Sequence, residues 1–427
     1  MKKLFALLLV LVMSISLVAC GGGESTTTDS GSETDGPITI EFWHSMGSAT
    51  GELVQEIVDE FNASQDEVFV EAIYQGDYNA AGTKLQAAVS GGNAPHVVQI
   101  EITRVGMYAA EGLLMDLQPF DDADDEFNAE DLYPGVMDFS YYEGQLVSLP
   151  NGRSTPVMYY NVDALKEAGF ENAPENWDEL REASNAVAKD GTLGYGISLG
   201  DSWYYLAMML TAGGQVYNEE GNDIGFYGEA GVKPLQLWLD MLSDGSAFIP
   251  EGEDYASNSA LRNAFMAEQC NIIMQSSAQY RSLVDNSEFE VGVAYIPKLT
   301  NYAAIPGGSN LVAFEGMSEA EAQATWKFLK YMCSADVAGK YAAGTGYLPT
   351  SEAALNSAIY QEKLAEYPHL DVAVRQLEYF VEMPFDQSYV EIKDNVIGRY
   401  VQECIIGGMS PEDAVENMHL ETVEFYK

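Results

Sequence analysis

At residues 149–161 the chain reads LPNGRSTPVMYYN, and its organisation depends on this stretch. The first letters end a predicted strand, and Pro150 is expected to stop it because proline cannot donate to a sheet ladder. A second proline keeps the connector extended, and another β-type run follows. Such a connector can cross between two packed bodies, which would place Arg153 and Ser154 in a ligand-binding gap. The alternative is a hairpin at the rim of one domain.

The composition limits the class of protein. A chain of 427 residues exceeds what one hydrophobic core normally holds, so two or more domains are expected. With 66 Asp and Glu against 20 Lys and Arg, the formal net charge is −46. This charge argues against binding to nucleic-acid phosphates and against electrostatic attraction to an anionic bilayer. We interpret it as a solvated acidic surface that keeps a secreted protein soluble.

The N-terminus has the features of an export signal. Two lysines precede the apolar run 4–12, which is too short to span a membrane. Residues 1–20 end in LVAC, which resembles the lipobox of bacterial lipoproteins and implies cleavage before a lipidated Cys20. A chance cysteine after a plain signal peptide is the alternative. The Gly- and Ser-rich segment 21–37 is a predicted flexible tether. We expect anchoring on the outer face of the bacterial cytoplasmic membrane, with the body in water.

Three further cysteines, Cys270, Cys333 and Cys404, lie far apart and lack metal-binding spacing. Buried thiols are expected, with one disulfide possible and no zinc site. The acidic run 121–131 superficially looks like a calcium loop but lacks the glycine at its sixth position. We predict a solvated surface run there, and no metal or cofactor.

The first hundred residues indicate an α/β fold. A period-two strand over 38–42 is followed by an apolar helical stripe over 53–61 and by a second strand over 68–74. This β-α-β order predicts parallel pairing. A loop is expected over 75–78, with the next helix running over 83–89.

Three polar or aromatic residues follow successive strand ends. Trp43 and Tyr78 come after the first two predicted strands, and Glu101 comes after a third over 97–100. Because ligands bind beyond the carboxyl ends of strands in open α/β sheets, these residues predict a binding site. The alternative is that the two aromatic residues belong to the core.

Specific motifs are spread along the chain: FWHSM at 42–46, GNAP at 92–95, STPV at 154–157, YYN at 159–161, GG at 307–308 and TGYLP at 345–349. Together they resemble the extracellular solute-binding proteins of ABC importers, in the carbohydrate-binding group and nearest to the glycerol-3-phosphate binders. The resemblance implies an α/β, two-lobed periplasmic-binding-protein-like fold of type II, with a cleft between the lobes and several crossover segments. One lobe would comprise 38–152 plus about 313–365, and the other 153–312 plus about 366–427.

The same resemblance implies ligand contacts at Tyr78, Ser154, Ser276, Gly308 and Tyr347. Two family contacts do not carry over. The acidic contact aligns with Ile102, one residue after Glu101, and the phosphate-binding arginine aligns with Asp394. The adjacent Lys393 is expected to point elsewhere.

An aspartate facing a phosphate dianion would repel it, so the sequence favours a neutral polyol, sugar or oligosaccharide over a glycerophosphate derivative. Sugars need aromatic surfaces and paired donors and acceptors. Trp43, Tyr78, Trp203 and Tyr347 are the candidate platforms. The candidate hydrogen-bonding groups are Glu101, Ser154, Ser276 and the Gly308 amide. Arg153 remains open as a contact to an anion.

The sequence therefore predicts a monomeric, non-enzymatic solute-binding protein that delivers its ligand to an ABC permease. Three alternatives differ in class. A lipid-anchored glycoside hydrolase would need two carboxylates facing across a sugar. A ferric-ion binder is suggested by the tyrosine pairs at 159–160 and 204–205. A passive surface lipoprotein would bind no solute.

Overall fold

The computed structural model describes residues 36–427, apart from 190 and 252–253. The expected signal, Cys20 and nearly all of the tether lie outside the described residues. Pro37–Lys427 forms one compact unit. Over the described part of the chain, no helix is both long and apolar enough to cross a membrane.

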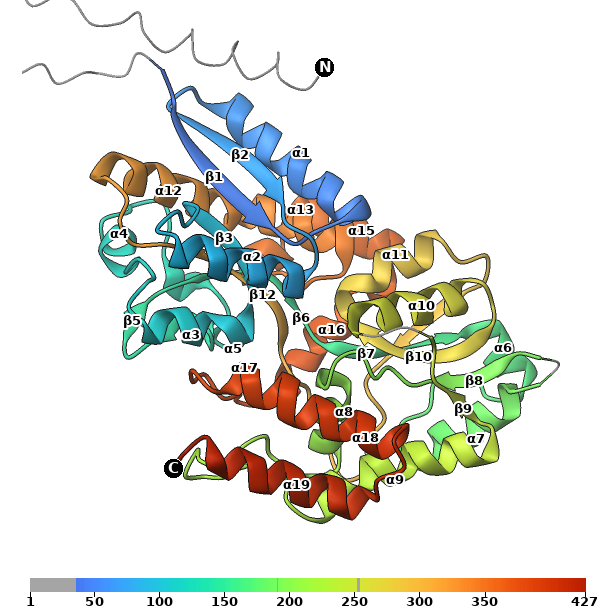
Figure 1. The fold of residues 1–427 in the computed structure, drawn as a ribbon. Coiled ribbons are helices and arrows are strands. Elements are labelled where there is room, and N and C mark those ends of the chain that lie inside the picture. Colours follow the sequence, from blue (N-terminus) through green and yellow to red (C-terminus); the bar gives the residue numbers. More distant parts are fainter. Residues whose placement is uncertain (1–35, 190, 252–253) are drawn as a thin grey trace, which may run out of the picture. The chain divides into compact units, whose positions relative to one another are not determined.

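The first of two five-stranded sheets has the order β2-β1-β3-β12-β6 (Figure 1). Its strands are β1 (Ile38–His44), β2 (Val68–Tyr74), β3 (Val97–Glu101), β6 (Leu149–Ser154) and β12 (Gly307–Ala313). Strand β1 pairs in parallel with both β2 and β3, which confirms the predicted β-α-β unit. Strands β12 and β6 add to it in antiparallel fashion.

Helices cover both faces of this sheet, whose central strands β3 and β12 are buried along nearly their whole length. The stripe of α1, with Val54, Ile57 and Phe61, shares a core with Phe328 of α12. The other face packs against Leu85 of α2. The helices around this sheet are α1 (Ser48–Ser64), α2 (Tyr78–Ser90), α3 (Val105–Ala110), α4 (Gln118–Asp122), α5 (Pro134–Met137), α12 (Glu319–Met332), α13 (Ala335–Thr345) and α14 (Glu352–Leu355).

The second sheet has the order β11-β7-β10-β8-β9. Its strands are β7 (Pro156–Asn161), β8 (Leu193–Gly196), β9 (Ala247–Phe248), β10 (Cys270–Ser276) and β11 (Val291–Ala294). Its helices are α6 (Val162–Glu167), α7 (Trp177–Val187), α8 (Trp203–Thr211), α9 (Glu229–Asp244), α10 (Asp254–Met266), α11 (Tyr280–Asp285), α15 (Ala358–Glu366), α16 (Asp371–Gln376), α17 (Tyr389–Glu391), α18 (Arg399–Ile405) and α19 (Pro411–Glu424). A short hairpin of β4 (Tyr141–Tyr142) and β5 (Gln145–Leu146) stands apart from both sheets.

The opening stretch crosses between the two sheets. Strand β6 ends at Ser154 in the first sheet and β7 starts at Pro156 in the second, so the hairpin alternative is wrong. The prediction that Pro150 stops the strand is also wrong, because Pro150 is the second residue of β6. An edge strand tolerates proline, since the missing N–H then breaks no ladder bond, and β6 is an edge. Two further passages connect the bodies, before β12 and after α14.

Two local expectations need correction. Helix α2 starts at Tyr78, because Asp77 caps it by accepting a hydrogen bond from Ala80 N, so Tyr78 is helical. The acidic run is only partly solvated. Asp121 accepts a hydrogen bond from Ala129 N at 2.9 Å, and Asp124 pairs with Lys330 at 2.8 Å.

The cysteines Cys270, Cys333 and Cys404 are free and buried, as expected, and the possible disulfide among them is not formed. Burial raises the pKa of Cys270 and Cys333 to about 12. The described residues contain no cluster of three or more His, Cys, Asp or Glu side chains arranged to hold a metal ion. One tyrosine of each pair that suggested iron binding lies in the core: Tyr159 donates to Ser276 O at 2.9 Å, and Tyr205 donates to Gly231 O at 2.9 Å.

Candidate functional site

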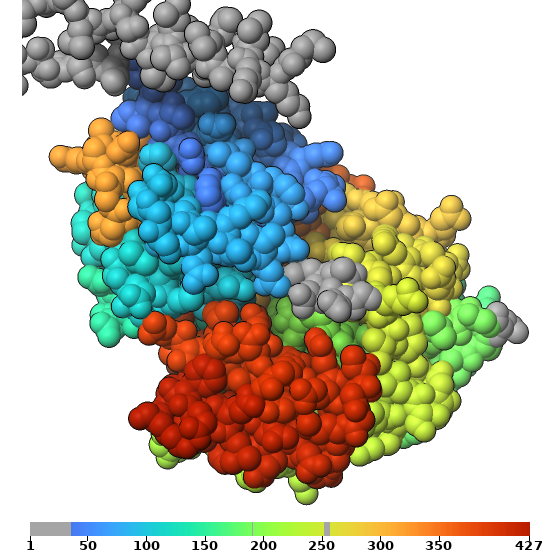
Figure 2. Space-filling model, viewed as in Figure 1, coloured from blue at the N-terminus to red at the C-terminus, as the bar shows by residue number. Residues whose placement is uncertain are grey.

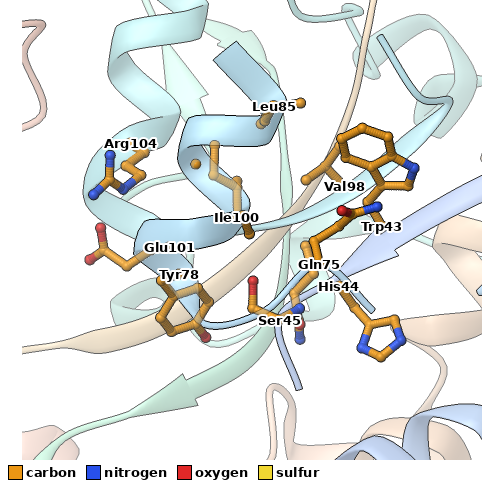
Figure 3. Close-up of a pocket in the computed structure, with 13 residues that line it drawn as sticks. Trp43, His44, Ser45, Gln75, Tyr78, Leu85, Val98, Ile100, Glu101 and Arg104 are labelled. Carbon is orange, nitrogen blue, oxygen red and sulfur yellow. Dashed lines mark hydrogen bonds between the residues drawn. The ribbon is translucent and has the colours of Figure 1, made fainter. Parts of the chain in front are cut away.

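A narrow pocket opens where β1, β2 and β3 end (Figure 3). Trp43, Tyr78 and Glu101 all line it, so the structure brings these three predicted side chains together. Figure 3 shows Glu101 and Arg104 at one end and Trp43 at the other. The cavity measures about 10 Å³, which is room for about one water molecule and not for a sugar. The Trp43 ring also packs on the apolar cluster of the first sheet, as the core alternative requires.

A second cavity of about 310 Å³ lies between the two bodies. The first body supplies Glu101, the last residue of β3, and Arg104 shortly after it. The second body supplies Asp201 before α8 and several residues of the segment 390–402. Among the described residues, the cavity is lined by Asn79, Glu101, Arg104, Leu199, Gly200, Asp201, Ser202, Val390, Glu391, Lys393, Asp394, Asn395, Gly398 and Gln402. Glu101 borders both cavities, so it connects the strand-end pocket to the space between the bodies.

The second cavity is rich in charge. Lys393 Nζ lies 3.9 Å from Glu101 Oε1 and 3.3 Å from Asp394 Oδ1. Arg104 Nη2 lies 3.6 Å from Asp394 Oδ2. Burial raises the pKa of Asp201, whose Oδ1 accepts a hydrogen bond from Trp203 N at 2.9 Å. The interior therefore presents alternating donors and acceptors, with no aromatic side chain in its lining.

Three other predicted residues gather beside the crossing strands. Gly308 adopts φ +96° next to a register shift between β12 and β6, and a Cβ there would lie 1.8 Å from Gly152 O. The Tyr78 hydroxyl lies beside Ser309 and Tyr347, and burial raises its pKa well above the ordinary value. The Tyr347 ring stacks on another tyrosine and its hydroxyl approaches a methionine sulfur, so it is a buried wall of this region.

The remaining predicted residues have structural partners. Ser154 is 3% exposed and pairs with Gly307, against which the Trp203 ring packs. Trp203 Nε1 donates to Pro306 O at 3.1 Å. Ser276 Oγ accepts a hydrogen bond from Ala278 N at 3.3 Å. Ser154, Trp203, Ser276, Gly308 and Tyr347 line neither of the two cavities described above.

Arg153 lies in the interior. Its side chain is fully buried, with Nη1 donating to Asn310 Oδ1 at 3.2 Å and the guanidinium 5.3 Å from the centre of the Phe139 ring. Burial lowers its pKa to about 10, although Asp138 and Glu101 oppose the change.

Sequence reasoning missed Arg104 and Asp201 of the larger cavity, whereas the family resemblance had already placed Asp394 at a ligand-contact position. The expectation that Lys393 points elsewhere is wrong, because both Lys393 and Asp394 line the cavity. They lie in a π-helical segment, Ile392–Gly398. A π-helix has more residues per turn than an α-helix, so a different set of residues shares one face. No sequence pattern predicts that change.

Comparison with known proteins connects this geometry to a family. The sequence profile described as bacterial extracellular solute-binding protein matches residues 56–370. The chain is also 30% identical over 404 residues to the sn-glycerol-3-phosphate-binding periplasmic protein UgpB of Yersinia pseudotuberculosis, covering 88% of this chain and 90% of that one. The chain belongs to the bacterial extracellular solute-binding protein family.

Solved structures with under 25% identity match the fold of this solute-binding protein. The GacH receptor of Streptomyces glaucescens, studied with acarbose, superposes with a TM-score of 0.82 at 22% identity, covering 92% of this chain and all (100%) of that one. UgpB of Mycobacterium tuberculosis, in complex with glycerophosphocholine, gives 0.81 at 21% identity, covering 92% and 98%. The fold is thus the expected two-lobed type II periplasmic-binding-protein-like fold.

Proposed function

We propose that this solute-binding protein captures a sugar, oligosaccharide or polyol in the 310 Å³ cavity between its lobes and delivers it to an ABC permease. The observation that carries the proposal is that both lobes line one polar cavity of ligand size. The amide groups of Asn79 and Gln402 and the hydroxyl of Ser202, with the charged residues around them, supply the donors and acceptors that hydroxyl groups require.

Closure of the lobes would couple binding to transport. A ligand that contacts both lobes binds the closed state better than the open one and shifts the population toward it. The lobes we propose follow the sheets: 38–152 with the later segment to about 365, and the second sheet with about 366–427. Strand β12 pairs in the first sheet from Gly307, six residues before the boundary at 313 that the sequence suggested.

We infer that the protein acts as a monomer anchored by lipid at Cys20 on the outer face of the cytoplasmic membrane. The basis is the sequence of residues 1–20, and the family is extracellular.

We also propose binding without catalysis. Glu101 accepts a hydrogen bond from Thr103 and faces Lys393, and Asp394 pairs with two cations, so these carboxylates have partners in the protein. A glycoside hydrolase would instead convert an oligosaccharide, so product formation on incubation with oligosaccharides would contradict this proposal.

A thermal-shift screen against sugars, polyols and glycerophosphodiesters tests the function. A ligand present at a hundred times its Kd is expected to stabilise the protein by about 2.7 kcal/mol, which raises the unfolding temperature by several degrees. Recovery of the ligand unchanged would support binding alone. If no compound of these classes shifts the transition, the passive-lipoprotein alternative is favoured.

Trp203→Ala is expected to weaken solute binding by about 1–3 kcal/mol, because the ring packs on the crossing passage at Gly307 and its loss leaves that passage unsupported. Isothermal titration calorimetry measures the effect. Trp203→Phe is the matched control, since it keeps an aromatic ring but loses the hydrogen bond to Pro306 and part of the indole, and it should lose less. Unchanged affinity in Trp203→Ala would show that its support of the crossing passage does not affect solute binding.

A further inference from the structure

The Asp394 carboxylate bridges two cations in the cavity between the lobes. Oδ2 lies 3.6 Å from Arg104 Nη2, and Oδ1 lies 3.3 Å from Lys393 Nζ. Arg104 follows β3 of the first lobe, whereas Lys393 and Asp394 belong to the π-helical segment of the second. Figure 2 shows the C-terminal segment, in red, directly against the cyan segment that follows β3. The Asp394 carboxylate therefore links the two lobes, with one oxygen near Arg104 of the first lobe and the other near Lys393 of the second.

The Asp394 carboxylate is important because the two cations beside it are largely buried. The Lys393 side chain is only 8% exposed and that of Arg104 19%, whereas Asp394 is 36% exposed at the rim. Cations this shielded from water need an anionic partner, and here the protein supplies its own. Glu101, at 3.9 Å, is a second counterion for Lys393.

We propose that Asp394 determines the specificity of the site: its carboxylate occupies the position between Arg104 and Lys393 that the phosphate of a phosphate ester would otherwise take. This inference rests on the proposed function, because it assumes that solute enters this cavity. With Asp394 in place, four carboxylates (Glu101, Asp201, Glu391 and Asp394) face two cations in the lining. A phosphate dianion would add to an excess of negative charge, whereas a hydroxyl-rich neutral solute would not.

Titration calorimetry on the full chain and on Asp394→Asn, at one fixed ionic strength, tests the proposal. The probes are sn-glycerol-3-phosphate, inorganic phosphate and glycerol. Asp394→Asn is expected to bind glycerol-3-phosphate at least about tenfold more tightly than the unsubstituted protein, because a like charge is removed from an apposed position. Glycerol should not gain. A gain for both phosphates indicates a site for the free ion as well, and a gain for glycerol-3-phosphate alone indicates a site for the ester.

Two variants make the outcome decisive. Glu391→Gln removes the same charge from the same cavity lining, yet Glu391 has no ion pair within 4.0 Å in the described part of the chain, so it should not gain phosphate binding. Adding Arg104→Gln to Asp394→Asn should cancel the gain. Unchanged unfolding temperatures would confirm that the variants are folded.

An equal gain in Glu391→Gln, no gain in Asp394→Asn, or tight glycerol-3-phosphate binding by the unsubstituted protein would each overturn the proposal. Retained sugar or polyol binding in these cases would leave the proposed function standing. If the unsubstituted protein bound none of the sugars, polyols or phosphate esters, the proposed function itself would be rejected.

Discussion

Gly308→Ala is expected to destabilise the protein by about 3 kcal/mol or more and to abolish solute binding. Gly308 has φ +96°, which an L-residue adopts only with strain. An added Cβ would lie 1.8 Å from Gly152 O and 3.1 Å from Arg153 Cα, and both are backbone atoms that no rotamer change can move. Relief therefore requires β12 to separate from β6 at the register shift, where the chain crosses between lobes.

Urea unfolding of both proteins measures this effect, with calorimetry for binding. Gly316→Ala is the matched control, since Gly316 has φ +99° but no atom within 4 Å of the added Cβ. It should lose only about 1 kcal/mol, the cost of the backbone conformation. Equal losses in the two variants would show that the approach of Gly152 is unimportant, and that the crossing strands are not held this closely.

The second large effect is alkaline unfolding, which we expect to begin near pH 10 and to be complete within about two pH units. Burial raises the pKa of Tyr159, Tyr195, Tyr205 and Tyr341 above the ordinary value of 10.0. Above pH 10 the unfolded chain releases these protons while the folded chain retains them. The folded state then binds more protons, so the free energy of unfolding falls as pH rises, and this stabilisation is fully present only below pH 10.

The size of the effect follows from proton linkage. Each retained proton costs about 1.4 kcal/mol of stability per pH unit above 10, so four tyrosines together cost about 5–6 kcal/mol per unit. This is comparable with the whole stability of a typical domain, about 5–15 kcal/mol. Circular dichroism and tyrosinate absorbance should therefore change together in one cooperative step. Gradual tyrosine ionisation with unchanged circular dichroism would contradict the burial of these rings.

Local signals in the sequence predicted much of the architecture. The period-two run before Trp43 forms β1, and the apolar stripe after it forms the buried face of α1. Both belong to the β-α-β unit in which β1 pairs in parallel with β2. Local sequence also sets helix starts: Ser318 forms a capping box with Glu321, and the Ser410 side chain caps α19. The convergence of Trp43, Tyr78 and Glu101 on one pocket followed from strand order alone, because parallel strands end at one edge.

Most of the contacts in the larger cavity could not be predicted from the sequence. Arg104 and Asp394 are 290 residues apart, and their 3.6 Å contact depends on how the second lobe returns to the first. Counting along the chain placed Lys393 on the wrong side, because an α-helical period does not apply within a π-helix. The acidic run misled for a related reason, since Asp124 finds Lys330 only once α12 has packed beside it.

By itself, the sequence determined the α/β class, the first β-α-β unit and the capped helix starts, because each depends on neighbours a few residues apart. The tertiary structure alone decided that Arg153 is fully buried and that Pro150 lies in an edge strand. It also decided which charges surround the cavity between the lobes. The physical reason is that burial and ion pairing are set by segments hundreds of residues apart, whose meeting no local pattern encodes.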